Sequence, residues 1–181
     1  MNNTIQKSTI DETIEFYSII RDLLNNETVQ KMKFYKQHYD TSTYEHCFYV
    51  SYICFKMCKH LHLDYKSAAR AAMLHDLFLY DWRNSKKKLN LKGYHAFVHP
   101  KIALENANKI FDLNNKEKDI IEKHMWPVTF FSFPKYPETV VITLADKYSA
   151  LHESYKHYYN FLTKRKVIKY AYLFLCLLIF I

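Results

Sequence analysis

Apolar residues recur at helical spacing in the first part of the chain. Between Asp11 and Leu24 they fall three or four positions apart, which predicts an amphipathic helix. Its apolar positions are Ile14, Tyr17, Ile20, Leu23 and Leu24. A second helix is expected to end near residues 38–41, where polar residues gather. The apolar positions that predict it are Val29, Met32, Phe34 and Tyr35. Both helices are interpreted as packing elements that contribute no functional residues.

The next segment predicts two helices that bring histidines toward the core. A third helix is expected to begin at Thr43, with its inner stripe at Val50, Ile53, Cys54, Met57 and Leu61. This spacing puts His46 one turn earlier on the same buried face. A fourth helix is expected after Asp64, a residue suited to capping. Four alanines give it one side small enough for close approach to a neighbouring helix, namely Ala68, Ala69, Ala71 and Ala72. His75 continues that face.

The remaining pattern predicts a long loop and three more helices. Residues 80–93, with three successive lysines at 86–88, form the longest expected loop, and such loops often line a substrate mouth. A fifth helix is expected to start at His99-Pro100, with proline in the first turn. A sixth starts at Asn114 and reaches His124. After a loop containing three prolines, the positions that predict the seventh are Val140, Val141, Leu144, Ala145, Tyr148 and Leu151, with Asp146 in its middle.

Composition supports an all-α fold in a single domain. The 181 residues contain one glycine and four prolines, which is little turn chemistry for a meander of strands. A single glycine also excludes the glycine-rich phosphate loops of Walker A and dinucleotide-binding motifs. A chain of this size can fold without disulfides or structural metals, so any metal is expected to be functional. The predicted organisation is N-terminal helices over 1–42, a core over 43–152 and a C-terminal helix with an apolar tail over 153–181.

The net charge of +8 would suit a polyanionic partner. Most of the excess is lysine scattered along the chain, and no basic and aromatic recognition motif accompanies it, so nucleic acid is not the expected partner. A phosphorylated small molecule would benefit from the same charge. The four cysteines form no Cys-x-x-Cys pair and no signal peptide opens the chain, which favours a reducing cytoplasm.

The C-terminal segment Tyr170–Ile181 is uninterrupted apolar sequence, preceded by Lys164, Arg165, Lys166 and Lys169. It is shorter than the roughly 20 apolar residues of a bilayer span. Three interpretations stay open: a buried or oligomer-forming helix, a membrane contact, and an atypical chain end that lowers solubility.

The pair His75-Asp76 is the most informative chemical feature of the sequence. Neighbouring residues on a helix point about 100° apart, so both can reach one ion only beside a helix end. His46 and Asp146 are natural partners, because each lies in the buried half of a long helix. Imidazole and carboxylate together suit a divalent ion such as Fe, Mn, Mg or Zn. The alternatives are a satisfied core histidine at His46 and a salt-bridged or N–H-bonded carboxylate at Asp146.

The order His46, His75-Asp76, Asp146 resembles the HD-domain family of metal-dependent phosphohydrolases, over residues 43–151. The elements around His99-Pro100 and His124 are similar to those of two-metal members. The resemblance implies an HD-type helical bundle in which His46, His75, Asp76 and Asp146 hold one ion. It further implies that Asp76 is the catalytic carboxylate, bridging to a second ion held by His99 and His124.

Two departures separate the chain from the HD-GYP branch of that family. The lysine that many HD-GYP members place soon after the His-Asp pair is absent, because residues 77–80 read Leu-Phe-Leu-Tyr. After His124 the chain reads Met-Trp-Pro-Val, instead of a second histidine, an acidic residue and the Gly-Tyr-Pro signature. Cyclic dinucleotide hydrolysis in the HD-GYP manner is therefore not expected, and the chain is more similar to small stand-alone HD proteins.

The function that follows is hydrolysis of a phosphate ester or anhydride, from a nucleotide or related small metabolite, by metal-activated water. Lys147 and Arg83 are the candidates to bind phosphate oxygens, against the alternative of ordinary solvated charge. His95 is a further candidate, either as a ligand or as a partner of one. The aromatics that could stack on a base or simply pack are Tyr80, Trp82 and Trp126. The alternative function is a metal-containing HD-fold binding or regulatory module with little turnover.

Overall fold

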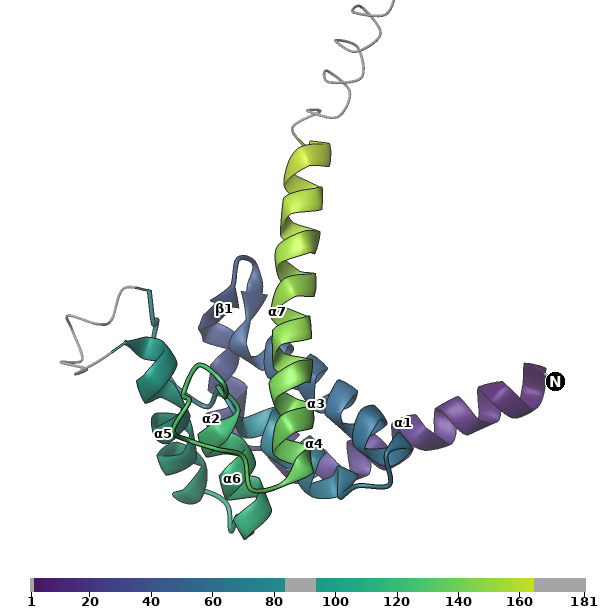
Figure 1. Ribbon diagram of the computed structural model, residues 1–181. Coiled ribbons are helices and arrows are strands. Elements are labelled where there is room, and N and C mark those ends of the chain that lie inside the picture. Colours follow the sequence, from purple (N-terminus) through teal and green to yellow (C-terminus); the bar gives the residue numbers. More distant parts are fainter. Residues whose placement is uncertain (1, 84–93, 165–181) are drawn as a thin grey trace, which may run out of the picture.

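The computed structural model describes residues 2–83 and 94–164. Within these residues the fold is helical apart from one small two-stranded hairpin, which confirms the all-α prediction (Figure 1). The helices are α1 (Asn2–Leu24), α2 (Glu27–Gln30), the 3-10 helix η1 (Lys31–Phe34), α3 (Thr43–His60), α4 (Tyr65–Leu74), α5 (His95–Asn108), α6 (Asn115–Lys123) and α7 (Pro137–Lys164). The strands β1 (Lys36–His38) and β2 (Thr41–Ser42) pair antiparallel.

Side-chain caps fix where the site-bearing helices begin. Ser42 and Glu45 form a reciprocal capping box at the start of α3, and Asn114 and Glu117 do the same for α6. Asp64 accepts a hydrogen bond from the backbone of Ser67 and starts α4, as predicted. Each cap satisfies amide groups that the first turn leaves without a partner. The starts of the third, fourth and sixth predicted helices are therefore set locally by sequence.

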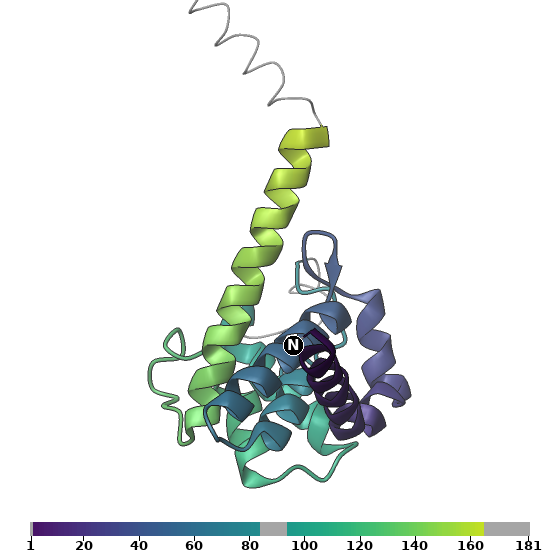
Figure 2. The ribbon, with the colours of Figure 1, turned by 90° about the vertical axis from the view of Figure 1, so that its right-hand side faces the viewer.

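Helices α3 and α4 pack against each other at the centre of the core. The four alanines of α4 are buried, which lets the two helix backbones approach closely. The aromatic rings of Phe16 and Phe55 fill the space between α1 and α3. Helix α7 lies across α3, and its C-terminal half extends beyond the rest of the bundle (Figures 1 and 2). Helices α4 and α6 both contact α7, so their C-terminal ends lie near the first half of that helix.

The second predicted helix is wrong beyond its first two turns. The chain forms the short α2 and η1 and then turns through the hairpin of β1 and β2, which periodicity did not predict. Phe34, expected on an inner face, is 84% exposed. The turn places Tyr39 at a φ of 49°, a left-handed conformation that tyrosine rarely adopts. Tyr39 stacks on His157 of α7 with ring centroids 4.1 Å apart, so a tertiary contact supports this turn.

Helices α5 and α1 begin earlier than predicted. Helix α5 begins at His95, so Pro100 lies inside the helix instead of in its first turn. Because proline has no N–H, the carbonyl of Ala96 loses its usual helical donor at this position. Helix α1 begins at Asn2, upstream of the amphipathic stretch that predicted it.

The apolar stripes predicted for the third and seventh helices are partly turned to solvent. On α7, Leu144, Tyr148 and Leu151 are each more than half exposed, whereas Ile142 and Ala145 are buried. Helix α7 carries apolar residues on several sides, so its spacing alone did not decide which side faces the core. On α3, Val50 and Cys54 are buried as predicted, whereas Leu61, which directly follows the helix, is exposed.

Some predictions fall outside the described residues. The apolar tail over 170–181 and the lysines at 86–88 belong to this group, and the domain boundaries stay predictions. Helix α7 runs without a break through the predicted boundary after residue 152. Among the described residues, no helix has both the length and the apolar character needed to cross a bilayer.

Candidate metal centre

Two helix ends deliver three of the predicted residues. His75 and Asp76 directly follow α4, and His124 directly follows α6. The Nδ1 atom of His75 lies 2.7 Å from the carbonyl oxygen of Ala72, and that of His124 lies 2.9 Å from the carbonyl oxygen of Ile121. Both rings are therefore folded back against the last turn of their own helix, beside the helix end where the sequence predicts an ion.

The orientation of these rings leaves their Nε2 atoms as lone-pair donors. A carbonyl oxygen only accepts hydrogen bonds, so the Nδ1 atoms of His75 and His124 must carry the proton. His99 on α5 follows the same rule, because its Nδ1 lies 2.8 Å from the carbonyl oxygen of His95. In the neutral form all three rings then present an unprotonated Nε2 to the interior. This is the arrangement that metal-binding histidines require.

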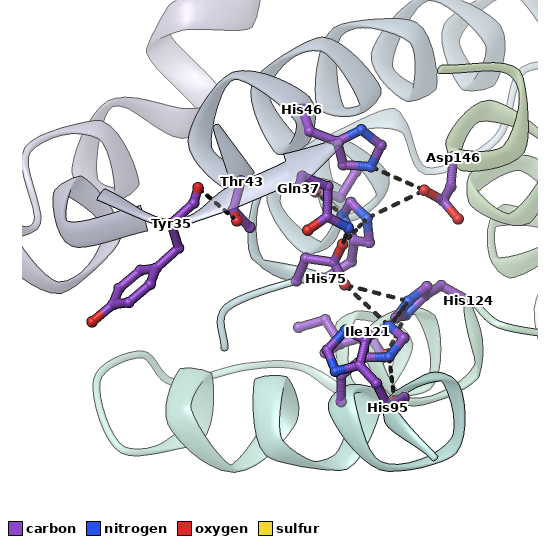
Figure 3. Close-up of polar contacts among 12 residues, drawn as sticks. Tyr35, Gln37, Thr43, His46, His75, His95, Ile121, His124 and Asp146 are labelled. Atoms are coloured by element: carbon purple, nitrogen blue, oxygen red, sulfur yellow. Dashed lines mark hydrogen bonds and ion pairs between the residues drawn. The ribbon is translucent and has the colours of Figure 1, made fainter. Parts of the chain in front are cut away.

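Four residues make up what we call the first half of the centre: His46, His75, Asp76 and Asp146. Figure 3 labels three of them, His46, His75 and Asp146. The Oδ1 atom of Asp146 lies 3.0 Å from His46 Nε2 and 3.7 Å from His75 Nε2. His75 Nε2 is also 3.5 Å from Oδ2 of Asp76. Two ligands that each bind an ion at about 2.0–2.2 Å and roughly at right angles lie about 3 Å apart. His46, His75 and Asp76 offer ligand atoms within 4.8 Å of one another, and Asp146 is close to both histidines, so these four side chains are candidate ligands of one cation.

Asp76, His99 and His124 make up the second half. The Oδ1 atom of Asp76 lies 3.2 Å from His99 Nε2 and 3.7 Å from His124 Nε2. The two Nε2 atoms are 2.9 Å apart. With both Nδ1 atoms protonated and both rings neutral, two lone pairs face each other at this distance, which is repulsive unless the two nitrogens share a proton or a metal ion. Asp76 belongs to both halves and joins them.

Burial strengthens the argument for a cation. His46 and His75 are 0% exposed and Asp76 is 2% exposed. His75 Nε2 and Asp76 Oδ1 are buried without a hydrogen-bond partner among the described residues. Buried polar atoms of this kind are costly unless they are paired or coordinate a metal. The donor set and the unpartnered atoms together fit a divalent metal ion.

The pKa values of His46 in the first half and of His124 in the second half are shifted in opposite directions. Burial disfavours a charged ring at His46, but the hydrogen bonds with Asp146 and Glu153 outweigh it and raise the pKa of His46 to about 10. Burial and the neighbouring rings of His75 and His99 lower the pKa of His124 to about 3. Without metal, the first half therefore holds a proton that a metal must displace, whereas His124 is already neutral.

A cavity of about 450 Å³ opens beside the centre. Asp76, His99, His124 and Asp146 line it on one side, and Lys147 and Trp82 contribute to its wall. The Lys147 ammonium is buried without a hydrogen-bond partner within residues 2–83 and 94–164. Burial lowers the pKa of Lys147, while the neighbouring Asp146 opposes that change. The cavity therefore combines candidate metal ligands with an ammonium group that has no hydrogen-bond partner among the described residues.

The other predicted site residues occupy more peripheral positions. The Arg83 guanidinium lies over the Trp82 ring, 5.3 Å from its centroid, and donates to the carbonyl oxygen of Gln37. The Trp82 ring in turn stacks on His95. His95 also lies parallel to His99 and shares a hydrogen bond with the hydroxyl group of Tyr80. His95 thus supports His99 by its backbone carbonyl and by stacking. The cysteines of α3 are buried and free.

Three residues near the centre were missed by sequence reasoning. Gln37 of β1 donates from Nε2 to Oδ2 of Asp76, and His38 lines the cavity. Both depend on the hairpin, for which the sequence offers no glycine or asparagine turn signal. Glu153 of α7 lies 2.9 Å from His46 Nδ1 through its Oε1 atom. Its position seven residues after Asp146 was a usable signal, because two helical turns return to the same face.

Comparison with known proteins identifies the fold family. The sequence model of the HD domain matches residues 43–151, which is more than half of the chain and includes every residue of both halves. The chain belongs to the HD-domain family. The search of curated proteins gave no match, and neither did the search of solved structures.

The HD-domain assignment gives the buried cluster a chemical context. HD domains form a superfamily of metal-dependent phosphohydrolases, although not every member is an enzyme. The HD-domain core of this chain carries the buried His and Asp groups that could hold a divalent metal. The family resemblance seen in the sequence is thereby confirmed.

Proposed function

We propose that this HD-domain protein hydrolyses a phosphate ester or anhydride of a nucleotide or related small metabolite. The observation that carries the proposal is the pair of buried ligand groups that share Asp76 and border one cavity. His46, His75, Asp76 and Asp146 would hold one divalent ion, and Asp76, His99 and His124 a second. When bound, such ions lower the pKa of water and neutralise charge on a phosphoryl group.

The chain's own residues supply orientation and charge. Asp76 is held between the two halves, with Gln37 donating to its Oδ2 atom. The backbone carbonyls behind His75, His99 and His124 prevent these rings from turning away from the centre. Lys147 supports phosphate binding, because an ammonium group without a partner on the cavity wall can donate to non-bridging phosphate oxygens. Arg83 is a second candidate for the same role, because its guanidinium lies over Trp82, which lines the cavity.

The size and lining of the cavity support a small-molecule substrate. A volume of about 450 Å³ lies within the range of about 300–1,000 Å³ that small-molecule sites occupy. The indole of Trp82 adds an aromatic surface beside the charged groups. A phosphorylated metabolite with a planar base or ring matches this combination of charge and aromatic surface.

The test combines metal analysis with a hydrolysis screen over nucleotides and phosphomonoesters. The wild-type protein should retain divalent metal and hydrolyse at least one compound. Asp76→Asn removes the charge shared by both halves while keeping the side-chain shape, and should lower kcat/KM by at least about 10³-fold, equivalent to roughly 4 kcal/mol. Asp112→Asn, at an exposed aspartate, is the matched control and should retain wild-type activity.

Two results would count against the proposal. Hydrolysis that survives Asp76→Asn unchanged would place the activity elsewhere. Full metal occupancy without turnover of any phosphate compound would instead favour the metal-containing binding or regulatory module. The metal assay and the activity assay separate these cases, because the regulatory module keeps the metal and loses only the turnover.

A further inference from the structure

Glu153 distinguishes His46 from the other three histidines of the centre. His75, His99 and His124 each direct Nδ1 toward a backbone carbonyl three or four residues earlier in their own segment. His46 instead directs Nδ1 toward Oε1 of Glu153, at 2.9 Å, across the packing of α3 against α7. One ring of the four is therefore oriented by a carboxylate from another helix.

Helix α7 holds the His46 ring from both sides. Asp146 and Glu153 are seven residues apart and share one face of the helix. Their carboxylates lie 3.0 Å from Nε2 and 2.9 Å from Nδ1 of the same fully buried ring. Turning the ring about its Cβ–Cγ bond would break both contacts. The Glu153 side chain is itself only 10% exposed, which limits its freedom to move away.

We propose that Glu153 is a positioning residue that fixes His46 Nε2 as a metal ligand. The inference rests on the proposed function and concerns the first half of the centre alone. Glu153 accepts a hydrogen bond from Nδ1–H, so in the neutral ring the Nε2 lone pair faces Asp146. A carboxylate behind a metal-binding histidine also raises the basicity of the ligating nitrogen more than a carbonyl does. Glu153 thereby adds a negative charge near the first half. The histidines of the second half are oriented by backbone carbonyls, which are neutral.

The geometry also contains a competing arrangement. His38, His46 and Glu153 offer ligand atoms within 4.8 Å of one another, so this group could itself hold a cation. That arrangement would use His46 Nδ1 as a ligand and would leave it without a proton. The presence of a proton on Nδ1 in the metal-loaded protein therefore separates the positioning role from a separate metal site.

The experiment compares Glu153→Ala and Glu153→Gln with the wild-type protein and with Glu105→Gln, a control at an exposed glutamate. Titration with Mn²⁺, followed by electron paramagnetic resonance, gives the affinity for each ion. Glu153→Ala should weaken binding of one Mn²⁺ by about 10–100-fold, the usual effect of losing an outer partner of a metal-bound histidine. Glu153→Gln retains an acceptor without the charge and should weaken it less. Glu105→Gln should bind as the wild type does.

A second measurement reads the ring directly. In the protein loaded with diamagnetic Zn²⁺, proton–nitrogen correlation spectra should show a His46 Nδ1 proton protected from exchange in the wild type and in Glu153→Gln. In Glu153→Ala the same proton should exchange rapidly. A role limited to packing α7 on α3 would lower thermal stability without changing which His46 nitrogen carries the proton.

Each other outcome overturns a defined part of the account. Wild-type Mn²⁺ affinity in both Glu153 variants, with an unchanged His46 signal, would overturn the positioning role alone. A wild-type His46 that lacks the Nδ1 proton when metal is bound would do so in favour of the His38 group. Absence of Mn²⁺ and Zn²⁺ binding in the wild-type protein would overturn the proposed function together with this inference.

Discussion

The two halves of the centre share Asp76 but differ in the groups that surround their histidines. The first half places His46 between two carboxylates, and its pKa is raised to about 10. The second half sets two imidazoles against each other at 2.9 Å, and the pKa of His124 is lowered to about 3. The first half is therefore arranged to retain positive charge, whereas the second is arranged with neutral lone pairs. The comparison indicates that the two halves should respond differently to loss of a ligand, to substrate and to pH.

Matched truncations of the two halves should give the largest difference. His46→Ala and His99→Ala each remove one imidazole and leave every ligand of the other half in place. Each is expected to weaken one bound Mn²⁺ by about 100-fold or more, at the upper end of the effect of losing an outer partner, and to spare the other ion. Mn²⁺ titration of the two variants measures this. Equal loss of both ions in both variants would mean that the halves act as one inseparable site.

Lys147 and Arg83 test which side of the cavity receives phosphate. Lys147→Ala should lower kcat/KM by about 10–100-fold, because a hydrogen bond to a charged group contributes about 1.5–3 kcal/mol. Arg83→Ala should cost less than about threefold, since the guanidinium already lies on Trp82 and donates to a backbone carbonyl. Steady-state kinetics on the best substrate decide between them. A larger loss in Arg83→Ala than in Lys147→Ala would reverse the assignment.

The smallest expected effect is the pH dependence of stability in the metal-free protein. The folded pKa of His46 is above the ordinary value of about 6.5, so its contribution is complete below pH 6.5 and is lost as pH rises toward 10. The folded pKa of His124 is below that value, so the unfolded chain takes up a proton first and stability falls as pH drops from about 6.5 toward 3.

Thermal denaturation after chelation should therefore show maximal stability near pH 6–7. On the acid side and on the alkaline side of this maximum, Tm should fall by at least about 3 °C, equivalent to roughly 1 kcal/mol for a chain of this size. Glu153→Gln should flatten the alkaline limb and leave the acid limb unchanged. An alkaline limb that keeps its full slope in this variant would show that Glu153 does not set the protonation of His46.

The residues of the candidate centre could be singled out from the sequence because they follow local signals. His75 and Asp76 are adjacent at the end of an alanine-rich helix, and His46 lies one turn before a buried stripe. Capping residues then fix the starts of α3, α4 and α6. These features are set by neighbours in the chain, so the order of residues was sufficient to predict them.

What sequence reasoning missed depends on contacts between distant segments. The hairpin that carries Gln37 turns at Tyr39, whose left-handed backbone is supported by stacking on His157 more than one hundred residues away. The inward face of α7 carries the buried apolar residues Ile142 and Ala145 together with Asp146 and Glu153, which contact His46, whereas Leu144 and Leu151 are exposed. Glu153 lies just beyond the last residue predicted for the core, on the same continuous helix as Asp146.

Crystals of the protein loaded with Mn²⁺, measured for anomalous scattering, test the central claim most directly. The account predicts an anomalous peak within about 2.0–2.3 Å of His46 Nε2, with His75, Asp76 and Asp146 completing its coordination. It predicts a second peak between Asp76, His99 and His124. Anomalous density confined to the surface, with neither half holding an ion, would contradict the account.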